Sequence, residues 1–94
     1  MSRLLVPLLA AAVVASAVPA SAAERTVTLA VDNMTCELCP PIVKKSLARV
    51  PGVAKTDVSA ERHTATVVFD DQRTTLAALL AATTNAGYPS RPVQ

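Results

Sequence analysis

The chain has 94 residues, nine basic and seven acidic side chains, and a formal net charge of +2. This length allows one domain, and the weak charge, with Phe69 and Tyr88 as the only aromatic residues, excludes a typical nucleic-acid surface. The two cysteines, Cys36 and Cys39, stand too close together for a bridge between them to support a disulfide-dependent fold.

The N-terminus is predicted to be a secretion signal. Arg3 precedes an apolar run over residues 4–18 that is short for a membrane span. Ala20-Ser21-Ala22 then has the small-x-small pattern of a signal-peptidase site, with cleavage after its last residue or, as second choice, after its first. We expect residues 1–22 to be the signal peptide and 23–94 the exported domain; an uncleaved membrane anchor is the alternative. Export places the cysteines in an oxidising compartment.

The first half of the exported region predicts a strand and a helix. Residues 26–31 alternate between apolar and polar side chains, as in a half-buried strand, and Asp32-Asn33 ends it. A helix is expected from Pro40-Pro41, because prolines are tolerated in a first turn, until Pro51-Gly52 stops it. Its buried stripe consists of Val43, Leu47 and Val50, with Ile42 and Ser46 alongside.

The second half predicts a hairpin, a helix and a last strand. Strands over residues 53–59 and 64–69 are joined by a polar turn, and Ala54, Thr56 and Val58 are expected to share one face. A second helix is expected to open at Asp70-Asp71, where acids favour the positive end of the helix dipole. Gly87 suits its end, and Pro89 and Pro92 confine the last strand, residues 88–93, to a sheet edge. The buried side of this helix consists of Leu76, Leu79, Leu80 and Thr83.

The order β-α-β-β-α-β predicts an α+β, ferredoxin-like fold with a four-stranded antiparallel sheet and both helices on one face. Because each element reverses direction, His63 and Tyr88 should lie at the same end of the molecule as Cys36 and Cys39. No apolar surface repeat calls for a partner chain, so we expect a monomer.

Cys36 and Cys39 are the candidate metal ligands. Cys39 stands at a helix start, where the dipole and unpaired N–H groups are expected to lower its pKa. Thiolates select soft ions such as Hg(II), Cu(I), Zn(II) and Cd(II), and Hg(II) ranks first because two thiolates in a line satisfy it. A single His and no second cysteine pair argue against a closed four-ligand zinc site. Cys-x-x-Cys also occurs in redox enzymes, and a plain disulfide is a further reading.

A family resemblance is carried by six segments: Thr26-Val27-Thr28-Leu29, Met34-Thr35-Cys36-x-x-Cys39-Pro40, Val43-Lys44-Lys45, Gly52-Val53, Val67 to Asp71 and Ala86-Gly87-Tyr88-Pro89-Ser90. On these the exported region resembles the heavy-metal-associated domain family, and within it the periplasmic mercury-binding proteins of bacterial mercury-resistance operons. The resemblance implies that Cys36 and Cys39 bind Hg(II) in the periplasm, without enzymatic activity, and pass it to an inner-membrane mercuric transporter. An exported copper(I) chaperone and a small thiol-disulfide oxidoreductase are the alternatives.

Five other features near the cysteines allow two readings each. Met34 is a thioether ligand or a hydrophobic plug under the loop. Tyr88 shields the site or packs between helix and sheet. His63 is a ligand or a solvated turn residue. Glu37 raises the thiol pKa values slightly or adds a ligand oxygen. The Lys44-Lys45 pair attracts an acidic partner or keeps the helix face solvated.

Overall fold

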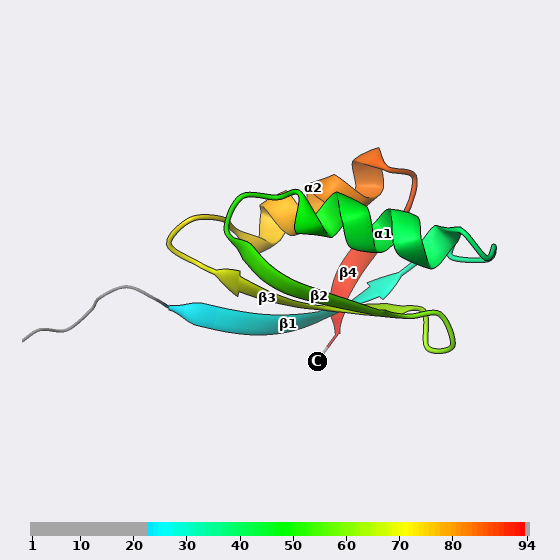
Figure 1. Cartoon of the computed structure of the whole chain (residues 1–94), viewed down its shortest axis with the longest axis horizontal. Coiled ribbons are helices and arrows are strands. Elements are labelled where there is room, and N and C mark those ends of the chain that lie inside the picture. Colours follow the sequence, from blue (N-terminus) through cyan, green and yellow to red (C-terminus); the bar gives the residue numbers. More distant parts are fainter. Residues whose placement is uncertain (1–22, 94) are drawn as a thin grey trace, which may run out of the picture.

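The computed structural model describes residues 23–93, so the expected signal peptide, residues 1–22, lies outside the described residues. The elements are β1 (Glu24–Val31), α1 (Cys39–Ala48), β2 (Val53–Ser59), β3 (Thr64–Asp70), α2 (Leu76–Asn85) and β4 (Ser90–Val93). The strands form one antiparallel sheet in the order β2-β3-β1-β4, and Figure 1 shows both helices on the same face of it. The predicted α+β ferredoxin-like fold is confirmed. No helix in the described part is long and apolar enough to cross a membrane.

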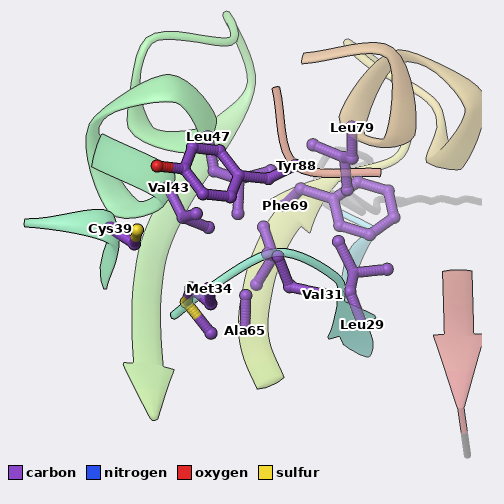
Figure 2. Packing of buried hydrophobic residues seen from close by; sticks show 11 residues of the cluster. Leu29, Val31, Met34, Cys39, Val43, Leu47, Ala65, Phe69, Leu79 and Tyr88 are labelled. Atoms are coloured by element: carbon purple, nitrogen blue, oxygen red, sulfur yellow. The ribbon is translucent and has the colours of Figure 1, made fainter. Parts of the chain in front are cut away.

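The core is one layer between the sheet and the two helices (Figure 2). Alternate residues of the two central strands point into it, because successive side chains of a strand face opposite ways. These are Leu29 and Val31 of β1 and Ala65, Val67 and Phe69 of β3, all at most 2% exposed. Val43 and Leu47 of α1 and Leu79 of α2 cover them and are fully buried. The predicted burial of Val43, Leu47 and Leu79 is therefore confirmed. The expectation that Ile42 lies beside the buried stripe of α1 is wrong: it is 43% exposed, because successive residues of a helix point about 100° apart and Val43 takes the inward position.

The predicted start of the second helix is wrong. Asp70 ends β3, and its carboxylate accepts a hydrogen bond from the Gln72 N–H at 2.9 Å, which forms a turn in place of a helix start. Helix α2 begins at Leu76, where the Thr75 hydroxyl caps the helix by accepting from the Ala78 N–H at 3.1 Å. The two acids are separated from the helix start by a short loop.

The predicted inner face of β2 is wrong at one position. The pairing of β2 with β3 shifts register between Val53 and Lys55, and an irregularity of this kind reverses the alternation of side chains. Ala54 is therefore exposed, whereas Thr56 is buried and Val58 half-buried as expected.

Three connections meet at one end of the molecule, as predicted. The Val31 N–H at the end of β1 donates to the His63 carbonyl in the β2–β3 turn at 2.8 Å. The next residue, Asp32, donates its N–H to the Pro89 carbonyl in the α2–β4 connection, also at 2.8 Å. The segment that leads to the cysteines therefore lies between the two other connections.

Candidate metal centre

The loop between β1 and α1 is held by its first residues. Asn33 adopts a left-handed backbone conformation with φ 69°, which asparagine tolerates better than most residues. Its side-chain amide donates to the Gly87 carbonyl at 3.2 Å, so the loop is tied to the end of α2. Met34 follows and is only 3% exposed within the core cluster. The reading of Met34 as a hydrophobic plug fits this burial.

The two cysteines have different environments. Cys36 is exposed at the loop surface, whereas Cys39, the first residue of α1, is 4% exposed and belongs to the core cluster. Their sulfurs are joined as a disulfide, with the Cα atoms 5.2 Å apart. The Cys36 N–H donates to the Cys39 sulfur at 3.2 Å, and the Cys39 N–H donates to the Cys36 carbonyl at 3.2 Å. The described state is thus the oxidised one, and two free sulfurs require its reduction.

The start of α1 offers fewer free N–H groups than the sequence suggested. Leu38 is the N-cap residue and provides no side-chain cap. Pro40 and Pro41 have no N–H, and the Cys39 N–H already has the Cys36 carbonyl as acceptor. In the oxidised pair, the backbone N–H that donates to the Cys39 sulfur is that of Cys36.

Tyr88 reaches the core through the end of α2. The Tyr88 N–H donates to the Thr83 carbonyl at 2.8 Å and the Gly87 N–H to the Thr84 carbonyl at 2.9 Å, the paired bonds of a Schellman motif. Gly87, with φ 100°, occupies its left-handed position. Tyr88 is 9% exposed in the cluster that includes Val43, and Figure 2 places its ring beside α1. This burial supports the packing reading.

The other sequence candidates lie at the surface. His63 is exposed and is linked to the site end of the molecule by its backbone carbonyl. Glu37 is exposed between the cysteines. Within residues 23–93 no group of three or more His, Cys, Asp or Glu side chains is placed to hold a metal ion together.

Sequence reasoning missed one contact next to the loop. A single guanidinium nitrogen of Arg91 lies 3.1 and 3.3 Å from the two carboxylate oxygens of Asp32. The residues are 59 positions apart, so no local pattern marks the pair. The left-handed conformation of Asn33, by contrast, follows a local preference, because asparagine tolerates it in turns.

Together these features define a ferredoxin-like domain with a Cys-x-x-Cys pair where its first helix begins. The heavy-metal-associated domain matches residues 28–89, and the chain belongs to this family, as the sequence resemblance indicated.

Known proteins of similar sequence and structure agree with this assignment. The chain is 51% identical over 90 residues, 96% of each chain, to the mercuric transport protein periplasmic component of Pseudomonas fluorescens. It matches the crystal structure of oxidized MerP from Ralstonia metallidurans CH34 with a TM-score of 0.76 and 50% identity, covering 77% of this chain and 100% of that one. The mercury-bound form of MerP, the periplasmic protein of the bacterial mercury detoxification system, matches with a TM-score of 0.68 and 51% identity over the same shares.

Proposed function

We propose that the chain is a periplasmic mercury carrier that binds one Hg(II) through Cys36 and Cys39 and passes it to an inner-membrane mercuric transporter. The observation that carries the proposal is one exposed and one buried sulfur at the start of α1, in a chain that shares half its sequence with mercuric transport proteins of the periplasm. The expected signal peptide supplies the route to that compartment.

Capture is a ligand exchange without electron transfer. Two thiols bind one Hg²⁺ and release two protons, which leaves a neutral bis-thiolate complex. The exposed Cys36 makes the first contact with an incoming ion, and Cys39 closes the pair. Burial keeps the second sulfur dry and its rotamer restricted, so the complex forms with little loss of side-chain entropy.

Release uses the same asymmetry in reverse. A thiolate of the acceptor attacks the metal from the open side of the loop, forms a third metal–sulfur bond, and weakens the two existing ones. Cys36 leaves first and takes up a proton, because its side of the metal is solvated. A second acceptor thiolate then displaces Cys39, which also takes up a proton, so both cysteines return to thiols. No bond of the protein backbone changes, so the carrier is ready for another ion.

The disulfide state cannot take part in this exchange. Its reduction consumes two electrons and two protons from a dithiol and yields the two cysteine thiols and the oxidised dithiol. We therefore infer that the carrier is active only while its cysteine pair is reduced.

Native mass spectrometry tests the proposal on the reduced chain from residue 23 with one equivalent of Hg(II). The expected result is one added mercury and two lost protons. The double variant Cys36→Ser, Cys39→Ser is expected to retain none, and retention by this variant contradicts the proposal. In a competition titration, preference for Cu(I) over Hg(II) would assign the chain to copper transport. Turnover in an insulin-reduction assay would assign it to thiol-disulfide exchange.

A further inference from the structure

We propose that the outer side of α1, next to the cysteine loop, attaches the protein to an anionic phospholipid surface. Two large apolar side chains are exposed there: Leu38, between the cysteines, is 69% exposed, and Ile42 is 43% exposed. Ile42 was expected beside the buried stripe of its helix, yet it faces solvent. Both lie within one turn of Cys39, so they border the metal site itself.

Two basic residues lie on the same side of the helix as this apolar pair. Lys45 and Arg49 follow Leu38 at the spacings i+7 and i+11, with Ile42 at i+4, which places all four residues in one row along a helix. Leu38 and Arg49, the two caps, have helical backbone angles, so the row is unbroken. All four side chains are exposed. We call Leu38, Ile42, Lys45 and Arg49 the docking stripe.

Charge is distributed unevenly around this stripe. Helix α1 and its C-cap carry Lys44, Lys45 and Arg49 and no acidic residue, and α2 carries no charged residue at all. Within residues 23–93 the cations of the stripe form no salt bridge. Glu37 is the one acid beside it. The remaining acids lie in strands and in loops outside the helices: Glu24, Asp32, Asp57, Glu61, Asp70 and Asp71.

This arrangement fits a lipid surface. A helix at a bilayer surface places leucine and isoleucine at the acyl boundary, while lysine and arginine extend toward anionic headgroups. Each basic residue near such a surface strengthens binding about fivefold. The uncharged helix α2 lies beside α1 in the same layer (Figure 1) and presents no acid that the surface would repel.

Attachment through the stripe would place the exposed Cys36 at the membrane surface. This consequence rests on the proposed function, since it brings the cargo to the level of a membrane-embedded acceptor. Lipid binding itself requires no metal and is tested in the oxidised, metal-free chain from residue 23. Among the described residues 23–93, the buried hydrophobic core runs from Leu29 to Tyr88, so this chain contains all of it. Loss of mercury binding and loss of lipid binding are therefore separate outcomes.

The first experiment measures sedimentation with vesicles of phosphatidylglycerol and phosphatidylcholine in equal parts, against pure phosphatidylcholine. The expected result is weak binding to the anionic vesicles at millimolar lipid, abolished by high salt. Lys45→Gln with Arg49→Gln should weaken it about 30-fold, and Leu38→Ala with Ile42→Ala by about tenfold or more. The control Lys55→Gln with Arg73→Gln removes the same charge from outside the helices and should have a much smaller effect.

The second experiment uses the absence of tryptophan from the sequence. Leu38→Trp introduces one reporter into the stripe, and Val93→Trp introduces one on β4, where the valine is 37% exposed. The Leu38→Trp emission should shift to shorter wavelength with anionic vesicles, and the Val93→Trp emission should not.

Three results would overturn the proposal. They are no binding to anionic vesicles, equal binding to both vesicle types, or binding that the stripe variants leave unchanged. Stripe-dependent retention on immobilised polyglutamate without vesicle binding would assign the stripe to an acidic protein.

Discussion

Two glycines with nearly the same backbone conformation should respond differently to alanine. Gly87 has φ 100° and Gly52 φ 102°, so a side chain is strained at either position. An added Cβ at Gly87 meets nothing within 4 Å. At Gly52 it would lie 3.0 Å from the Arg73 Cβ and 3.1 and 3.3 Å from Thr74 side-chain carbons. Both variants therefore have backbone strain, and Gly52→Ala has steric overlap in addition.

The magnitudes follow from these two contributions. Backbone strain lowers the free energy of unfolding by about 1–2 kcal/mol in both variants. At Gly52 two of the three close atoms are Cβ atoms, which cannot move without the backbone, and overpacking of this kind costs about 1–3 kcal/mol more. Each kcal/mol lowers Tm by about 4–8 °C for a domain of this size. Gly52→Ala should therefore melt at least about 4 °C below Gly87→Ala.

Urea unfolding of the oxidised chain from residue 23, monitored by far-ultraviolet circular dichroism, measures the difference in free energy of unfolding between the two variants. Equal m-values in both variants would show that neither substitution changes the surface exposed on unfolding, so that the two free energies can be compared. Equal stabilities, or a lower stability of Gly87→Ala, would refute the reasoning, because the two positions differ mainly in the space around the new methyl group.

Further predictions concern buried polar groups and the cysteines. Among the described residues the buried Thr56 hydroxyl has no hydrogen-bond partner, whereas the Thr83 hydroxyl bonds to the Leu80 carbonyl at 3.1 Å. Thr56→Val should thus raise the free energy of unfolding by about 1 kcal/mol and Thr83→Val lower it by about 1–2 kcal/mol, as urea titrations would show. In the reduced chain Cys39→Ser should cost about 1–2 kcal/mol more than Cys36→Ser, because only Cys39 is buried; equal costs would contradict this. The apparent Hg(II) affinity should fall about 100-fold per unit of decreasing pH where both thiols are protonated, because two protons leave per metal; competition titrations across pH would test the slope.

Local patterns predicted most of the fold and part of the site. The alternation in β1 and β3 and the glycine at the end of α2 depend on neighbouring residues, so sequence spacing was enough to find them. The start of α2 was missed because both Asp70 and Thr75 have side chains that can cap a helix. In the structure Asp70 forms a turn with the Gln72 N–H, and the Thr75 hydroxyl caps the helix. The outward position of Ala54 follows from a register shift against β3, which no pattern within β2 reveals.

The sequence by itself determined the order of the elements and the candidate ligand pair, because periodicity and the Cys-x-x-Cys spacing are local properties. Only the tertiary structure decided how the two sulfurs differ. Cys39 is buried because α1 packs on the sheet, and Cys36 is exposed because the loop turns outward after Met34 enters the core. The tie from Asn33 to Gly87 spans 54 positions and exists only because β1 and the end of α2 meet at one end of the fold. Burial and contacts between distant residues depend on how the helices and strands pack together, and local sequence patterns do not show this.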